Sequence, residues 1–235
     1  MKARPIDIAR KLHISTSTLR HYEAWGLVPP IERAANGYRI YTEEHIAYFE
    51  SIRAMYPAFG MDVVRQAMHS LMRGDADAAL WAVNEAQAKL RQDKVMADKT
   101  IQLLESSVLD HVEETGGTGK WMSIGEVAAE TNIPGSAIRH WEKEGLIAPG
   151  RDPDNGYRRF NRAHLRQLLL IRTLRTAVYS LEVIKQVLEE IERQDVEHAR
   201  QTVRDTLQYL NKLNQAQCRG IHYLYKQCGV LRLLD

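Results

Sequence analysis

The strongest constraint on the fold is an internal repeat. Residues 6–46 align with residues 125–165 without a gap, at an offset of 119 residues. Residues 61–66 then align with residues 181–186 at an offset of 120, because the second copy has one additional residue between the two blocks. Two aligned blocks in the same order do not plausibly arise by chance, so the chain consists of two copies of one structural unit.

Each copy begins with the pattern of two short helices separated by a tight turn. The first helices are predicted at residues 5–12 and 123–131, and Ser123 and Glu126 have the spacing of a capping box at the start of the latter. Because a tight turn leaves little room between the helices, this arrangement predicts a helix-turn-helix motif in each copy.

The second helices are predicted at residues 15–25 and 134–144. Ser15 is expected to act as an N-cap, and Pro134 is expected at the first helical position, where its missing N–H costs nothing. A glycine, which favours the end of a helix, follows each of them. These glycines are Gly26 and Gly145.

The dipeptide Asn-Gly occurs once in each copy between two short extended segments, at Asn36-Gly37 and Asn155-Gly156. This pattern predicts a β-hairpin in each copy. A long helix is predicted to close each copy. The helices between hairpin and long helix are expected to begin near Thr42 and Met61 in the first copy, and near Asn161 and Leu181 in the second.

These elements predict a mainly α-helical chain with two winged helix-turn-helix domains. Each has a small β-hairpin wing, and each is followed by a long coiled-coil-like helix. The second helix of such a domain can enter the DNA major groove, about 12 Å wide, while the wing lies along the backbone. The predicted divisions are a first domain at 1–74, a long helix at 75–113, a linker at 114–120, a second domain at 121–194, and a second long helix with a C-terminal tail at 195–235.

Composition and charge narrow the class of protein. A hydrophobic content of 44% can build a core. The net charge is +2 for residues 1–60, −4 for 61–119, +4 for 120–175 and zero for 176–235. The two positive blocks contain the helix-turn-helix motifs, which suits a polyanionic partner, although ordinary surface charge can produce the same balance.

Several classes of protein and site are not expected. The sequence has neither an apolar run of about 18 residues nor an N-terminal signal-peptide core, so we expect a cytoplasmic, nucleoid-associated protein without a membrane partner. Its two cysteines cannot supply a disulfide framework. It has no phosphate loop, nucleophile elbow or HExxH motif, so no enzymatic activity and no cofactor are predicted.

Three motifs occur in the same order in both copies. The first copy has Thr-Leu-Arg-His-Tyr-Glu at 18–23, Gly-Leu at 26–27 and Asn-Gly-Tyr-Arg-Ile-Tyr at 36–41. The second has Ala-Ile-Arg-His-Trp-Glu at 137–142, Gly-Leu at 145–146 and Asn-Gly-Tyr-Arg-Arg-Phe at 155–160. These motifs resemble those of the MerR family of bacterial regulators, and with the long helices included the resemblance covers nearly the whole chain. It implies a DNA-binding transcription regulator that distorts promoter DNA and acts with RNA polymerase.

The recognition helices and wings supply the candidate DNA contacts. Arginine can bind guanine with two hydrogen bonds or grip a phosphate, and hydroxyl groups on the first helical turn can reach phosphates or base edges. Tyr22 and Trp141 either contact the DNA backbone or face inward, and Glu23 and Glu142 are interpreted as structural. The predicted DNA-binding residues are Ser15, Thr16, Ser17, Thr18, Arg20, His21, Tyr22, Tyr38 and Arg39 in the first copy, and Ser136, Arg139, His140, Trp141, Tyr157, Arg158 and Arg159 in the second.

The long helices carry apolar residues at intervals of three and four, as in coiled coils. In the first copy they are Leu80, Val83, Leu90, Ala97, Ile101, Leu104 and Val108, and in the second Val196, Ala199, Val203, Leu207, Leu210, Leu213, Ile221 and Leu224. In the MerR family the matching helices of two chains pair antiparallel. Here the two helices can pair within one chain, as a pseudo-dimer, or between two chains, as a homodimer. The homodimer would have four winged helix-turn-helix domains, which we call heads.

Cys218, His222 and Cys228 are weak candidates for a zinc or copper site. If the second long helix continues through them, the two cysteines lie about 15 Å apart along its axis and cannot share an ion. A break at Gly220 or Gly229 would remove this objection. No metal site is therefore predicted, and the cysteines are interpreted as small buried thiols.

The sequence thus predicts a sequence-specific DNA-binding regulator that forms an intramolecular pseudo-dimer. The two recognition helices differ at Thr16 and Gly135 and at Thr18 and Ala137, so its operator is expected to be an imperfect inverted repeat. Two alternatives remain open: an architectural or excisionase-like protein that bends DNA, and a regulator that senses a metal or oxidant.

Overall fold

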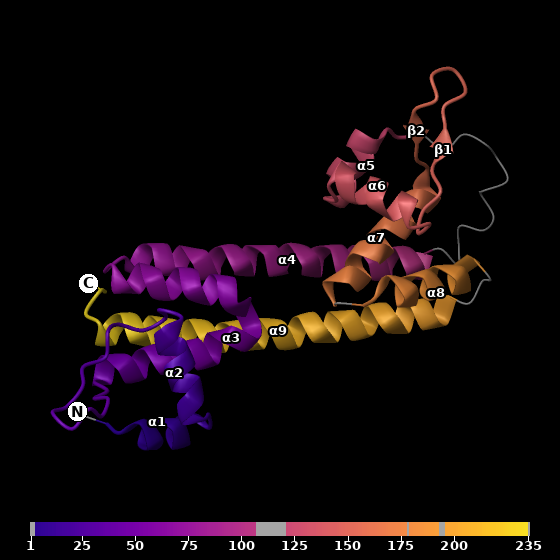
Figure 1. Ribbon diagram of the computed structural model, residues 1–235. Coiled ribbons are helices and arrows are strands. Elements are labelled where there is room, and N and C mark those ends of the chain that lie inside the picture. Colours follow the sequence, from indigo (N-terminus) through magenta and orange to yellow (C-terminus); the bar gives the residue numbers. More distant parts are fainter. Residues whose placement is uncertain (1–2, 107–120, 178, 193–195, 235) are drawn as a thin grey trace. The chain divides into compact units, whose positions relative to one another are not determined.

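A computed structural model describes residues 3–106, 121–177, 179–192 and 196–234. The described chain is mainly helical and divides into two compact units (Figure 1). The first unit contains Met1–Leu90 together with Lys212–Asp235, and the second contains Arg91–Asn211. Each unit therefore holds one helix-turn-helix copy and part of the other copy's long helix.

The first unit begins with α1 (Pro5–Leu12) and α2 (Thr16–Ala24), which form the predicted helix-turn-helix. His13 takes a left-handed conformation after α1 and turns the chain sharply. As predicted, Ser15 caps α2, because its hydroxyl oxygen accepts a 3.0 Å hydrogen bond from the Thr18 N–H. This hydroxyl satisfies a backbone donor that the helix leaves free at its start.

α3 (Glu43–Met72) contains the two helices predicted from Thr42 and Met61. They meet at a kink at Gly60, where the backbone is not helical and φ is +74°. Pro57 lies just before the kink, and its ring removes a backbone donor from the helix. Thr42 and His45 form a capping box at the start of α3.

The first copy ends in α4 (Ala76–Ser106), and the second in α9 (Val196–Val230). The apolar seam predicted for these helices is buried or half-buried at every position whose side chain the structure describes. Val108, the end of the predicted long helix at 107–113 and the predicted linker at 114–120 lie outside the described residues, as does the side chain of Val196.

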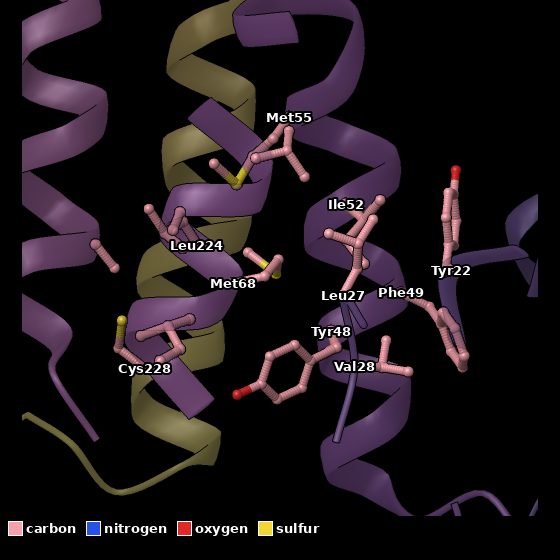
Figure 2. Packing of buried hydrophobic residues seen from close by; sticks show 14 of the residues in the cluster. Tyr22, Leu27, Val28, Tyr48, Phe49, Ile52, Met55, Met68, Leu224 and Cys228 are labelled. Carbon is pink, nitrogen blue, oxygen red and sulfur yellow. The ribbon is translucent and has the colours of Figure 1, made fainter. Parts of the chain in front are cut away.

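The core of the first unit includes residues from the last part of α9. Figure 2 shows Leu224 and Cys228 of α9 facing the same cluster as Met55 and Met68 of α3, and all four are fully buried. Val83 of α4 belongs to this cluster as well. The first head is therefore completed by chain from both copies.

Gly220 allows α9 to lie very close to α3. A Cβ atom at this position would be 2.9 Å from the Phe59 Cε2 and 3.2 Å from the Met55 Cα, which is shorter than van der Waals contact. Glycine in the middle of a helix costs about 1 kcal/mol relative to alanine, and this close packing offsets the cost. Neither Gly220 nor Gly229 breaks the helix, which continues to Val230.

The second unit repeats the arrangement with α5 (Ile124–Thr131) and α6 (Gly135–Lys143). Ser123 and Glu126 form the predicted capping box. Pro134 was predicted at the first helical position but is the N-cap of α6, with extended backbone. Since proline has no N–H, it can equally precede the first turn.

The wing of the second copy is a hairpin of β1 (Gly150–Arg151) and β2 (Arg158–Arg159), in which Arg151 pairs with Arg158. Among the described residues of the first copy, the corresponding segment has only isolated bridges, such as that between Arg33 and Arg39. The chain therefore turns back at both predicted hairpins, but among the described residues only the second copy forms a two-stranded β-sheet.

α7 (Arg162–Thr176) and α8 (Leu181–Glu192) follow, and Figure 1 shows α5, α6 and the hairpin gathered around α7. The core of this second unit includes Leu104 from α4 together with Ala199 and Val203 from α9. Across all the described residues, no helix combines the length and apolar character needed to cross a membrane.

Candidate nucleic-acid interface

The second helix of each helix-turn-helix has one buried and one exposed face. Leu19 of α2 and Ile138 of α6 are completely buried and fix the helices against their cores. Arg20 and Arg139, at matching positions, are exposed. The exposed faces also carry the matching pairs His21 with His140 and Ser17 with Ser136. The same set of donors is therefore available to a partner in both copies.

Tyr22 and Trp141 were predicted as DNA contacts, but the structure turns both rings inward. They are only 7% and 9% exposed, and the Tyr22 ring centroid lies 6.3 Å from that of Phe49 (Figure 2). Of the two interpretations given above, contact with the DNA backbone or an inward-facing ring, the inward-facing ring is the one that the structure shows. The physical reason is the helical period, which places them three residues after Leu19 and Ile138 on the buried face.

The hydroxyl groups at the start of α2 are partly engaged within the helix. Ser15 caps the helix, and its Oγ lies 2.9 Å from the Thr18 Oγ1. Thr16 is half-buried, whereas Ser17 is exposed. In α6 the exposed hydroxyl is Ser136, since Gly135 and Ala137 have none.

A salt bridge connects each wing to its recognition helix. The Nε of Arg39 donates a 2.6 Å hydrogen bond to the Glu23 Oε2. At the matching positions of the second copy, the Nε of Arg158 donates a 2.6 Å bond to the Glu142 Oε2. Both bridges are only partly exposed, so the charges are less screened than on an open surface.

The second wing has one further ion pair with its recognition helix, because Arg151 donates a 2.8 Å hydrogen bond to the other oxygen of Glu142. In the first wing, hydrogen bonding to Glu23 raises the pKa of Arg39 above its ordinary value. The wing arginines therefore have carboxylate partners within the protein. That they contact DNA phosphates stays a prediction, and the structure gives them a role in holding the wing.

We expect charge reversal to separate these two roles. Glu23→Arg and Arg39→Glu should each lower stability, whereas the double variant, which reverses the pair, should recover much of the loss. The coupling between the two sites is expected to be about 0.5–3 kcal/mol, as for other contacting pairs. Denaturant unfolding of the four proteins measures it, and additive effects would exclude the bridge.

The same four proteins test phosphate contact. If Arg39 only positions the wing, the reversed pair should bind DNA nearly as the parent does. A reversed pair that unfolds like the parent but binds all sequences more weakly would instead show that Arg39 also grips the DNA backbone.

The tips of the wings present exposed aromatic rings. Tyr38 and Tyr157 are 72% and 75% exposed. In both copies the side chain of the preceding asparagine holds this turn: the Asn36 Oδ1 accepts from the Tyr38 N–H and the Asn155 Oδ1 from the Tyr157 N–H. Large rings held this far into solvent are well placed to contact a partner surface.

Arg159, predicted as an additional wing contact, has an intramolecular neighbour. Its guanidinium carbon lies 4.3 Å from the centre of the Trp121 ring, a cation–π contact. A Cβ atom added at Gly150 would lie 3.3 Å from the Arg159 Cγ across the hairpin, so the glycine leaves room for this side chain. The matching residue of the first copy is Ile40, so this contact belongs to the second wing alone.

Sequence reasoning missed three residues at the ends of the recognition helices. Lys143 is exposed on α6, where the first copy has Ala24. Trp25 stacks on His21 at 5.8 Å between ring centroids, whereas the matching Glu144 lies 3.9 Å from His140. The aligned copies already pair Ala24 with Lys143 and Trp25 with Glu144, so the sequence contained the signal for these differences in charge and aromatic character.

The metal candidates do not converge. Cys228 is buried as interpreted, but the interpretation of Cys218 as a buried thiol is wrong, because the helix places it on an exposed face. The continuous helix separates the two cysteines by about 15 Å along its axis. Burial raises the pKa of the Cys228 thiol, which disfavours the thiolate that binds metals. His222 has its ring centroid 5.4 Å from that of Tyr223. In the described part of the chain, no three histidine, cysteine or acidic residues form a group suited to a metal ion.

Two family models match the chain. That of the MerR family regulatory protein matches residues 4–41, and that of the MerR HTH family regulatory protein matches residues 122–191. The two matches coincide with the two copies of the repeat. No solved structure shows a significant similarity to the chain.

Curated relatives include HTH-type transcriptional regulators named CueR and AdhR. CueR of Yersinia pestis is 30% identical over 105 residues, which are 42% of this chain and 75% of that protein. CueR of Salmonella typhi is 39% identical over 61 residues, 26% of this chain and 44% of its own length. AdhR of Bacillus subtilis is 31% identical over 86 residues, 37% of this chain and 61% of its own length. The Salmonella match thus spans less than half of that relative. With two helix-turn-helix copies that match its models, and a relative matched over three quarters of its length, this chain belongs to the MerR family of regulatory proteins.

Proposed function

We propose that the protein is a sequence-specific DNA-binding transcription regulator in which one chain supplies both heads as a pseudo-dimer. Family membership and the matched exposed arginines support DNA binding. The observation that carries the pseudo-dimer is that each head packs against the end of the other copy's long helix.

In the first unit, α9 makes polar contacts with α3 as well as apolar ones. The Ser51 hydroxyl donates a 3.0 Å hydrogen bond to the Tyr223 carbonyl, from a position 172 residues away in the sequence. The Gln217 side chain donates a 3.2 Å bond to the carbonyl of Ala58. The hydrogen bond between Gln217 and Ala58 is buried, and leaving such a buried polar group without a partner would be costly.

In the second unit, α4 makes the corresponding contacts with α7 and α9. The hydroxyl of Thr100 lies 2.9 Å from that of Thr173, and both are buried. Arg172 pairs with Asp93 at 3.1 Å, and Arg200 donates a 2.8 Å bond to the Leu104 carbonyl. The end of α9 and the end of α4 therefore each make specific polar contacts with the domain of the other copy.

These ends are not interchangeable, which favours pairing between unlike copies. The repeat places Thr100 of α4 at the position of Gly220 in α9. At the first head a Cβ atom there would lie 3.2 Å from the Met55 Cα, so a threonine would require α3 to move. Pairing the first copy with another first copy is therefore disfavoured.

The unlike heads support an imperfect inverted repeat as the operator. Arg20 and Arg139 match, but Thr16, Ala24 and Trp25 of the first copy correspond in the sequence to Gly135, Lys143 and Glu144 of the second. The operator arms should therefore share their spacing and differ in some bases. By similarity to the family, we further propose that the bound protein distorts promoter DNA for RNA polymerase, so that deformability contributes to specificity.

Light scattering of the full chain, alone and with DNA fragments selected from a random pool, tests this proposal. We expect one chain per operator and an asymmetric selected site. A stable two-chain species on a perfectly symmetric site would reject the pseudo-dimer. Fragments without a shared motif would reject sequence-specific regulation and favour an architectural protein that bends DNA.

A further inference from the structure

The first compact unit contains a surface groove with unbalanced positive charge. The groove lies between α1, α3 and α9 and has a volume of about 370 Å³, which is within the range of small-molecule sites. Its charged lining consists of Lys11, Arg53, Arg219 and Glu50, and its apolar lining includes Leu12 and Tyr223.

The one carboxylate in this lining already has two partners. Glu50 accepts a 2.6 Å hydrogen bond from Lys11 and a 3.2 Å bond from Lys226. Burial by itself would raise the pKa of Glu50, but the two lysines outweigh burial and hold this pKa below its ordinary value. The carboxylate is thus charged at neutral pH and is already paired with two cations.

The two arginines are in a different situation. Among the described residues, neither the Arg53 nor the Arg219 guanidinium forms a hydrogen bond or salt bridge. Both line the groove, next to the apolar surface of Leu12 and the Tyr223 ring. A guanidinium offers several donors in a planar arrangement that matches carboxylate and phosphate groups.

The second unit provides an internal comparison, because the repeat places Arg172 and Lys99 where the first unit has Arg53 and Arg219. There, both cations are paired within the protein. Arg172 forms a 3.1 Å salt bridge with Asp93, and Lys99 lies 3.7 Å from Glu130.

The two acids that pair with Arg172 and Lys99 in the second unit have no acidic counterpart in the first unit. The residue that corresponds to Asp93 is Leu213, and the one that corresponds to Glu130 is Lys11. One acid is replaced by an apolar residue and the other by a cation. The first unit therefore keeps two cations while both of their acid partners are absent.

We propose that this groove binds an organic anion, with its acidic group on Arg53 and Arg219 and its apolar body on Leu12 and Tyr223. The site is separate from the recognition helices, so it goes beyond the function proposed above. Because it lies where α9 packs on the first head, a bound anion would stabilise that packing.

Calorimetric titration of the full chain without DNA tests the site. The probes are 2-naphthoate, its neutral analogue 2-naphthamide, and inorganic phosphate. We expect one 2-naphthoate per chain, with 2-naphthamide and phosphate both weaker. Arg53→Gln and Arg219→Gln should each weaken 2-naphthoate about tenfold, since hydrogen bonds to charged groups contribute enough for that factor. Arg65→Gln, an exposed arginine of α3 outside the groove, is the matched control.

A further variant, Lys11→Glu, restores the acid of the second copy without removing either arginine. It should form a pair with Arg219 and abolish 2-naphthoate binding, and thermal unfolding checks that each variant is folded. The proposal is overturned by the absence of measurable 2-naphthoate binding, by equal binding of 2-naphthoate and 2-naphthamide, or by binding that the two arginine variants leave unchanged. None of these results depends on whether the protein binds DNA.

Discussion

Leu224→Ala is expected to lower the free energy of unfolding by about 2–5 kcal/mol, as for other large-to-small changes in a packed core. Leu224 is completely buried in the core of the first head, although it belongs to the last helix of the second copy. Its counterpart Leu104 is 6% exposed in the core of the second head, and Leu104→Ala should fall in the same range. Denaturant unfolding measures both changes.

Tyr225→Ala is the matched control for this prediction. Tyr225 is next to Leu224 on α9 but is 58% exposed, so its loss should change stability by less than about 0.5 kcal/mol. The unfolding midpoint should also be independent of protein concentration if α9 packs on its own chain, because no association is then coupled to folding. Equal effects of the two variants, or a midpoint that rises with concentration, would contradict intramolecular packing.

Replacing Arg20 or Arg139 with alanine is expected to weaken binding to the selected operator by about 1–3 kcal/mol for each arginine that reads a base. Both side chains are exposed on the second helix of a helix-turn-helix, at matching positions of the two copies. Because the heads are proposed to occupy different arms, each variant should relax the base preference of one arm only. Titration of operators mutated in one arm measures this.

A matched control for nonspecific charge is Arg65→Ala, which removes an exposed arginine outside the recognition helices. It should leave the base preferences of both arms unchanged. If both recognition-helix variants bind like the parent, these helices do not read the operator. A uniform loss on every sequence would reassign the arginines to phosphate contact.

The sequence determined the two heads and their local structure. The repeat gave their number and order, and the capping residues Ser15 and Ser123 lie at the starts of α2 and α5 as predicted. Such features depend on side chains within four residues of one another, so a sequence pattern contains all the interacting parts. The exposed position of Arg20 follows from the same helical period that buries Leu19.

Features made by residues far apart in the sequence needed the tertiary structure. Glu23 was interpreted as structural, but its partner Arg39 became evident only when the wing folded back on α2. The same holds for the close approach of α9 to α3 at Gly220. It also holds for the groove that Arg53 and Arg219 line. Both features bring together residues more than 150 positions apart in the sequence. Periodicity shows which face of a helix is apolar, but the shape and charge of the opposing surface decide what that face meets.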